Sequence, residues 1–120
     1  MLNLSHKNLI VYKISLSLIK EVYTATKSFP KEEKYILISQ VQRAAISVCS
    51  NIAEGASRIS KREKKRFYEI ARSSVVEIDT HFEIANVLEY YKNGQMKELE
   101  KYLEDVFRIL SKMINNLNPY

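Results

Sequence analysis

The stretch Gln95–Leu117, QMKELEKYLEDVFRILSKMINNL, decides the fold class because its apolar residues recur in helical steps. The spacing runs 3, 4, 3, 4, 3, 4, which keeps one apolar stripe on one face of a helix. The stripe consists of Met96, Leu99, Leu103, Val106, Leu110, Met113 and Leu117. Similar stripes run from Leu37 to Ile52 and from Phe67 to Ala85. The sequence therefore predicts amphipathic helices that share one core.

Capping and breaking residues divide the chain into four helices. Pro30 suits the first turn of a helix, and Ser60-Lys61-Arg62-Glu63 has the pattern of a capping box. Gly55 and Gly94 are expected to end helices. The predicted helices span about residues 5–26, 31–53, 61–93 and 95–116. Because the connections are short, we expect an all-α, antiparallel up-down-up-down four-helix bundle, with residues 1–120 forming a single domain.

Composition excludes several classes of protein. With 46% apolar and 28% charged residues but only 2 Gly and 2 Pro, the chain is globular and unlike a loop-rich β protein. A single cysteine, Cys49, excludes an internal disulfide or a Cys-rich zinc site. No apolar run approaches the length of a signal peptide or a membrane span. We therefore expect a soluble, cytoplasmic protein with no membrane contact.

Catalytic and metal-binding patterns are missing from the sequence. Di-metal bundles need a Glu-x-x-His step on two helices, whereas Glu77 and His81 are four residues apart and occur once. His6 has no second histidine or cysteine at ligand spacing. We expect no enzyme, no metal and no cofactor.

The first predicted helix carries two apolar stripes. One faces the core, and the second is offset from it by roughly 100°. The second stripe consists of Leu9, Tyr12, Leu16, Ile19 and Tyr23. We interpret it as a subunit interface, because the core of one bundle cannot cover both stripes. The alternative is that the small bundle wraps this helix deeply.

The positive charge lies in one segment. Residues 58–72 hold seven basic and two acidic residues, and the difference of five equals the net charge of +5. Because cations are disfavoured at a helix N-terminus, stability alone would not select this arrangement. A third helix ending at Gly94 would project its basic end about 15 Å beyond the fourth. The candidate nucleic-acid-binding residues are Arg58, Lys61, Arg62, Lys64, Lys65 and Arg66, with Phe67 and Tyr68 nearby for stacking. The alternative is an ordinary solvated helix end.

The second helix also carries a polar line at helical spacing. It consists of Gln40, Arg43, Ser47, Asn51 and Glu54, with Arg72 and Glu77 as candidate partners on the third helix. If the two lines face each other, Arg43 would pair with Glu77 and Glu54 with Arg72 in a buried seam. The alternative is the solvated flank of an amphipathic helix.

Four stretches of the chain resemble a known family. They are Ser28–Tyr35 (SFPKEEKY), Ser39–Val48 (SQVQRAAISV), Ser50–Gly55 (SNIAEG) and Phe67–Ser74 (FYEIARSS) followed by Val76-Glu77. The sequence resembles the four-helix-bundle proteins encoded in 23S ribosomal RNA intervening sequences. These are similar to the accessory variability determinant of diversity-generating retroelements. Cys49 stands where Pro is common in the family, and Ser73 where Gly is frequent.

The resemblance implies a homopentameric ring that binds RNA or DNA, and in the retroelement relatives the ring is a partner of a reverse transcriptase. It offers no catalytic residues. Combined with the basic segment, it favours a non-enzymatic, ring-forming bundle that holds nucleic acid through phosphate contacts. The alternative is an adaptor ring that docks a partner enzyme such as a reverse transcriptase and has no direct nucleic-acid role.

Overall fold

The computed structural model describes residues 1–117, which form four α-helices, with short 3₁₀ and π turns before α1 and between α1 and α2. The helices are α1 (Ile10–Ala25), α2 (Ser39–Ser57), α3 (Lys61–Val87) and α4 (Lys97–Leu117). There is no β-strand among residues 1–117, so the all-α class with four helices is confirmed. None of these helices combines the length and apolarity that crossing a bilayer requires. The expected cytoplasmic location stays a prediction.

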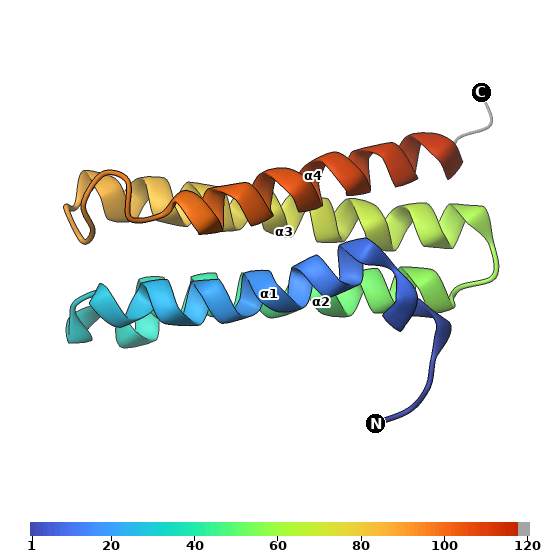
Figure 1. The fold of residues 1–120 in the computed structure, drawn as a ribbon, viewed down its shortest axis with the longest axis horizontal. Helices are drawn as coiled ribbons and strands as arrows, with labels where there is room; N and C mark the ends of the chain where they lie inside the picture. The colour runs from blue at the N-terminus through green and yellow to red at the C-terminus, as the bar shows by residue number, and fades with distance from the viewer. Residues whose placement is uncertain (118–120) are drawn as a thin grey trace.

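The helices run along one long axis and the chain reverses direction at each connection (Figure 1). Helix α2 packs most extensively against α3, and α1 contacts both α2 and α4. Figure 1 shows the N-terminal residues, the connection between α2 and α3, and the last turn of α4 at the same end of the molecule. The ring of several copies stays a prediction.

All four helices contribute apolar side chains to a single core. The stripes predicted from periodicity supply most of it, because burial of apolar surface is the main favourable term in folding. Completely buried core residues larger than alanine are Leu18, Val22, Val41, Val48, Ile52, Ile78, Val106 and Leu110. In α3 the core begins with Tyr68, which is 5% exposed, and the neighbouring Phe67 is only half-buried. In α4, Ile114 is buried, and Met113 only packs against the edge of the core.

The first two helices begin later than the sequence predicts. A 3₁₀ turn covers Ser5–Asn8, and the extended backbone of Leu9 separates it from α1. Before α2, a 3₁₀ turn at Lys31–Glu33 leads into a π turn at Lys34–Ile38. Regular α-helix starts only at Ser39.

The end of α2 also differs from the expectation, because the helix continues to Ser57 and passes through Gly55. Gly55 is buried, and a Cβ atom there would stand 2.6 Å from Cε1 of Tyr68. The glycine therefore allows α2 and α3 to approach each other closely. The interpretation of Gly55 as a helix stop is wrong.

Helix α3 ends at Val87, six residues before the predicted end at residue 93. Glu89 adopts the left-handed conformation, with a φ of 62°. Its N–H donates to the carbonyl of Asn86 at 3.0 Å. The N–H of the next residue, Tyr90, donates to the carbonyl of Ala85 at 2.9 Å. These two bonds are those of a Schellman motif, which usually has glycine at the left-handed position. Because glutamate rather than glycine occupies this position, the sequence did not indicate that the helix ends here.

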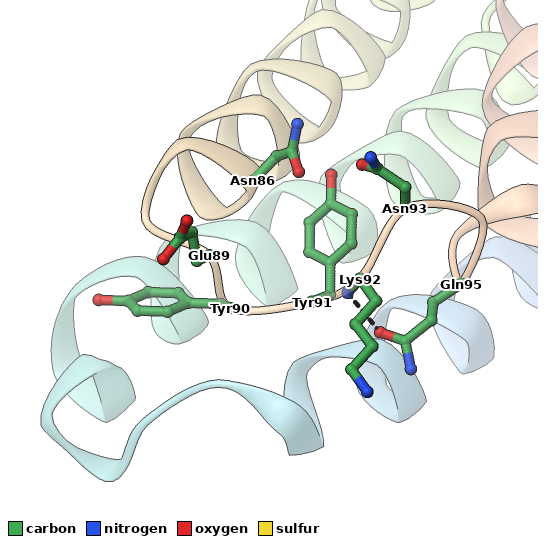
Figure 2. A pocket seen from close by; sticks show the side chains of 7 residues that line it. All are labelled: Asn86, Glu89, Tyr90, Tyr91, Lys92, Asn93 and Gln95. Atoms are coloured by element: carbon green, nitrogen blue, oxygen red, sulfur yellow. Dashed lines mark hydrogen bonds between the residues drawn. The ribbon is translucent and has the colours of Figure 1, made fainter.

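Aromatic side chains fix the connection that follows α3. The hydroxyl of Tyr90 donates to Oε2 of Glu33 at 2.6 Å, and its ring lies 5.5 Å from the ring of Phe29. The hydroxyl of Tyr91 donates to the carbonyl of Phe82 at 2.9 Å. Figure 2 shows the two tyrosine side chains pointing in different directions from the loop. The loop is thereby attached both to the turn before α2 and to the last turns of α3.

The predicted 15 Å projection of the basic end is wrong, because α3 ends at Val87 rather than at residue 93. The connection covers residues 88–96 rather than a tight turn, and α3 has 27 residues against 21 in α4. In Figure 1 the last turn of α4 reaches close to the level of the first turn of α3. The basic residues therefore lie at the end of the bundle and along the first turns of α3.

Candidate nucleic-acid interface

The connection between α2 and α3 consists of three residues, Arg58, Ile59 and Ser60. The Ser60 hydroxyl accepts a hydrogen bond from the Glu63 N–H at 3.1 Å and so caps α3. The Glu63 carboxylate does not complete the capping box, because it accepts from Arg66 instead, at 3.0 Å. Only half of the predicted capping box is present.

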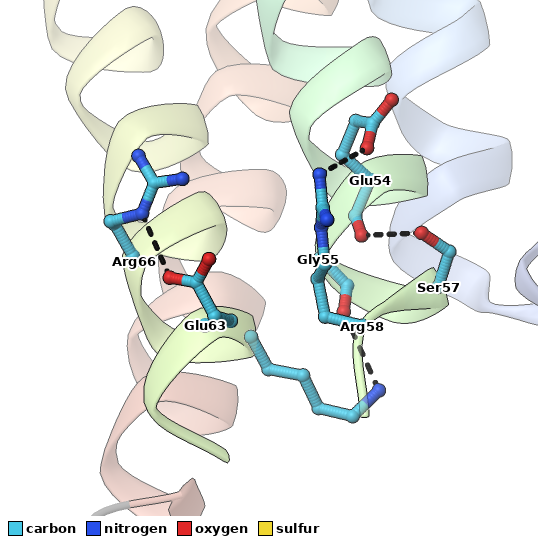
Figure 3. Close-up of polar contacts among 7 residues, drawn as sticks. Glu54, Gly55, Ser57, Arg58, Glu63 and Arg66 are labelled. Carbon is cyan, nitrogen blue, oxygen red and sulfur yellow. Dashed lines mark hydrogen bonds and ion pairs between the residues drawn. The ribbon is translucent and has the colours of Figure 1, made fainter. Parts of the chain in front are cut away.

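Two arginines of the candidate site are stacked on one aromatic ring. The guanidinium carbons of Arg58 and Arg66 lie 4.7 Å and 4.5 Å from the ring centroid of Phe67. Glu54 pairs with Arg58 at 3.2 Å, and Glu63 pairs with Arg66 at 3.0 Å, as Figure 3 shows. Each arginine is therefore held by a ring and a carboxylate, and its charge is partly balanced.

Lys64 is also engaged within the chain. Its ammonium donates to the carbonyl of Ala56 at 3.0 Å and to that of Gly55 at 3.4 Å. These are carbonyls of the last turn of α2, where unsatisfied oxygens attract cations. Lys64 acts as a brace between α2 and α3 rather than as a free ligand for a phosphate.

Three cations remain available to a partner, and we call Lys61, Arg62 and Lys65 the basic triad. No carboxylate among residues 1–117 forms an ion pair with any of them. Lys61 and Arg62 are exposed and Lys65 is half-exposed. Arg62 and Lys65 line an open hollow of about 510 Å³ together with Arg66 and the carboxylates Glu63 and Glu69. The structure thus divides the six predicted binding residues into three that are free and three that are engaged.

Glu63 remains ionised within this cationic surface. The hydrogen bond from Arg66 is the largest effect and lowers the pKa of the Glu63 carboxyl. Desolvation opposes it, and the charges of Arg66, Arg58 and Arg62 each lower the pKa by less. Six cations and the three carboxylates Glu54, Glu63 and Glu69 leave a local charge of six minus three, or +3. A charge of this size on one helix end attracts polyanions.

The predicted aromatic stacking is wrong for Tyr68, which is 5% exposed in the core. Burial also raises the pKa of its phenol. Phe67 is covered by Arg58 and Arg66, so its ring faces are already occupied. Within the described part of the chain, the candidate site therefore offers positive charge rather than an open aromatic ring.

The centre of the polar line on α2 contacts α3. The hydroxyls of Ser47 and Ser74 share a hydrogen bond of 2.9 Å, and the Asn51 amide donates to the Ser47 carbonyl at 2.9 Å. The ends of the line are exposed at Gln40, Arg43 and Glu54, and the candidate partner Glu77 on α3 is exposed as well. In a single chain the line is thus a flank with a small polar contact at its centre.

The predicted pairing of Glu54 with Arg72 is not formed. Glu54 pairs with Arg58, one turn further along the same chain segment. Arg72 donates to the hydroxyl of Ser111 on α4 at 3.1 Å. Arg72 is therefore turned towards α4 and away from α2.

The predicted pairing of Arg43 with Glu77 is not formed either. Glu77 lies 3.3 Å from Nε2 of His81, and Nδ1 of His81 is buried with no hydrogen-bond partner in the described structure. No group of three His, Cys, Asp or Glu side chains that could hold a metal occurs among residues 1–117. Glu77 and His81 thus form an isolated contact on α3.

The second stripe of α1 is divided between core and solvent. Leu9, Tyr12 and Ile19 pack against the edge of the core. Leu16 and Tyr23 remain exposed, at 48% and 40%. The bundle covers three of the five residues of this stripe, and the other two are exposed to solvent in a single chain.

Ile59 is a residue that the sequence analysis did not identify. It lies between Arg58 and the helix-capping Ser60, and its side chain is 99% exposed. The one sequence feature that indicated an exposed side chain here is the position of Ile59 between the end of one helix and the serine that caps the next.

The fold and the cationic helix end define a small all-α protein with a charged end surface. The chain belongs to the family of 23S rRNA-intervening sequence proteins, whose model matches residues 7–112. The family resemblance of the sequence is thus confirmed.

A solved structure from Bacteroides thetaiotaomicron, described as a protein of unknown function from the S23 ribosomal protein family, has a similar fold. The TM-score is 0.80 at 20% sequence identity, and the match covers 88% of this chain and 96% of that chain. At this identity the likeness shows the shared fold. Comparison with curated proteins finds no match.

Proposed function

We propose that this protein is a non-enzymatic, self-associating helical bundle that binds RNA or DNA through phosphate contacts at the basic end of α3. The basic triad carries the proposal, because its three cations are exposed or half-exposed and form no ion pair with a carboxylate of residues 1–117. Lysine and arginine that contact backbone phosphates supply affinity without reading the base sequence. Binding is therefore strong at low salt and tolerant of sequence.

The binding surface is held in a fixed geometry. Lys64 ties the first turn of α3 to the last turn of α2, and Arg58 and Arg66 are stacked on Phe67. A rigid arrangement loses less conformational entropy when a ligand binds. Lys64, Arg58 and Arg66 thus hold the triad in position, and their own positive charges attract the ligand without contacting it.

Self-association multiplies the binding surface. The exposed Leu16 and Tyr23 on α1 support an interface between copies. In a cyclic assembly each copy presents its basic end on the same rim. We propose a ring, a pentamer as the family resemblance implies, in which weak single-chain contacts add up to useful affinity.

The adaptor function remains the second candidate, and a groove between α3 and α4 favours it. Val75, Val76, Leu103 and Phe107 line an open groove of about 490 Å³. Val76 and Phe107 are 51% and 42% exposed. A partner protein docked there would make the bundle an adaptor whether or not nucleic acid is bound.

Charge reversal separates the two functions. A variant with Lys61, Arg62 and Lys65 all changed to Glu is compared with a variant carrying Lys20→Glu, Lys97→Glu and Lys101→Glu, which has the same net charge. Fluorescence anisotropy with an RNA duplex of about 20 base pairs measures binding, and light scattering measures the size of the assembly. We expect the first variant to lose binding at unchanged size and the second to retain binding. Equal binding by both variants would contradict the proposal.

A further inference from the structure

Ile59 is exposed to solvent in the connection between α2 and α3, where basic residues lie on both sides of it in the sequence. Its side chain is 99% exposed, the highest value of any large apolar residue in the described chain after Met1. Arg58 precedes it, and Lys61 and Arg62 follow it. Single exposed apolar residues are common on protein surfaces, so the position of Ile59 next to several cations, rather than its exposure alone, makes it a candidate contact.

The backbone on both sides of Ile59 is fixed. The Arg58 N–H donates to the Gly55 carbonyl at 3.2 Å, and the Arg58 guanidinium is stacked on Phe67. On the other side, Ser60 caps α3 by accepting from the Glu63 N–H. Arg58 and Ser60 both have extended backbone, so Ile59 is the tip of a short, anchored connection. The connection is thereby held in place on both sides of Ile59.

The neighbouring charges indicate which kind of surface this tip meets. Phosphates attracted by the basic triad bring sugars and bases within reach of Ile59, which lies next to the triad in sequence. A lipid surface is a poorer partner, because interfacial helices use a whole apolar face rather than one side chain. A symmetric contact between two copies at this tip would bring Arg58, Lys61 and Arg62 of both copies together, and like charges repel.

We propose that Ile59 is an apolar wedge that inserts between neighbouring bases of a duplex while the basic triad holds the backbone phosphates. This inference rests on the proposed nucleic-acid function and adds a contact to the bases. Proteins that insert isoleucine, leucine or phenylalanine between base steps must partly unstack them. Where stacking is already interrupted, that cost is smaller. The chain therefore prefers a duplex with an unpaired nucleotide to a continuous one.

Two RNA probes test the wedge: a continuous duplex of about 20 base pairs and the same duplex with a single bulged nucleotide. Affinity is measured by anisotropy at several salt concentrations for the wild type, Ile59→Ala, Lys61→Ala and the control Ile36→Ala. Ile36 is also exposed, at 64%, but belongs to the turn before α2. The wild type should bind the bulged duplex roughly five- to tenfold more tightly than the continuous one.

The two substitutions at the tip should act differently. Ile59→Ala should remove the preference for the bulge, weaken binding to the bulged duplex about tenfold and leave the salt dependence unchanged, because no phosphate contact is lost. Lys61→Ala should reduce the slope of log K against log salt by about one on both probes. Ile36→Ala should bind like the wild type.

Three outcomes would overturn the wedge. If the wild type binds RNA and Ile59→Ala binds each probe as tightly as the wild type does, Ile59 makes no contact with the bases. If Ile59→Ala changes the mass measured by light scattering, Ile59 belongs to a contact between copies. If the wild type binds neither probe, the proposed function itself fails and the wedge fails with it.

Discussion

The ring of Tyr68 occupies the space that a side chain at Gly55 would need. An ideal Cβ on Gly55 would lie 2.6 Å from Cε1 and 2.8 Å from Cδ1 of Tyr68, and 3.2 Å from Cβ of Phe67. This close approach joins the last turn of α2 to the second turn of α3. The same two turns carry the contacts that hold the candidate binding surface.

Gly55→Ala is therefore expected to destabilise the protein, although alanine normally stabilises a helix by about 0.5 to 1 kcal/mol relative to glycine. Overpacking against a buried ring costs about 1 to 3 kcal/mol, so the net effect should be unfavourable. Urea unfolding measures it. In a Tyr68→Leu background the same substitution should be less harmful, and a stabilised Gly55→Ala variant would contradict the packing described for this helix pair.

Glu89→Gly should stabilise the protein by about 0.5 to 1 kcal/mol, because glycine adopts the left-handed conformation without the Cβ penalty. The observed φ of 62° at Glu89 is the reason for this expectation. Glu89→Ala removes the same charge but keeps the Cβ, and it should bring no such gain. Equal stabilities of the Gly and Ala variants would show that the backbone at this position is not strained.

Most of the fold could be predicted from the sequence because helical periodicity reports burial directly. The stripe from Leu99 to Leu110 is buried as expected. Helix ends were less predictable, because they depend on conformations that several residue types adopt. Gly55 is the residue type that often ends a helix, but here it allows a close contact between α2 and α3. Glu89 is not a glycine, yet it adopts the left-handed conformation that ends α3.

The candidate site was predictable as a charged segment but not in its internal division. Sequence shows that Arg58, Lys64 and Arg66 are basic, and only the structure shows that Phe67 and the end of α2 engage them. Such contacts join residues on different turns and helices. The exposure of Ile59 likewise follows from the geometry of the connection, which periodicity does not specify.

Arg43→Ala should change stability by no more than about 0.5 kcal/mol, as is usual for surface substitutions. Arg43 is exposed and has no ion-pair partner among residues 1–117. Arg108→Ala, at an exposed arginine paired with Asp105, is the matched comparison in urea unfolding. A loss several times larger for Arg43 would mean that assembly buries the polar line after all.

Tyr90→Phe should make the protein less stable at pH 8, and the difference from the wild type should shrink as the pH rises above about 10, the ordinary tyrosine value. The hydrogen bond to Glu33 raises the pKa of the Tyr90 phenol, with burial and the nearby Glu33 and Glu32 charges adding to it. A raised pKa means that the stabilisation is complete below the unfolded value and is lost as the native phenol ionises.

Thermal unfolding from pH 8 to about pH 11 measures this dependence. Tyr35→Phe, at a tyrosine that is 84% exposed, is the control. A difference between the wild type and Tyr90→Phe that stays constant over the whole range would contradict the role assigned to the hydrogen bond with Glu33.

The salt dependence of RNA binding tests the central claim most directly, because only phosphate contacts release counterions in proportion to their number. For the wild-type protein and an RNA duplex of about 20 base pairs, log K against log salt between about 50 and 200 mM should fall with a slope of roughly −3 or steeper, since each copy supplies three cations. A slope near zero, or affinity that survives replacement of Lys61, Arg62 and Lys65 by glutamate, would contradict it.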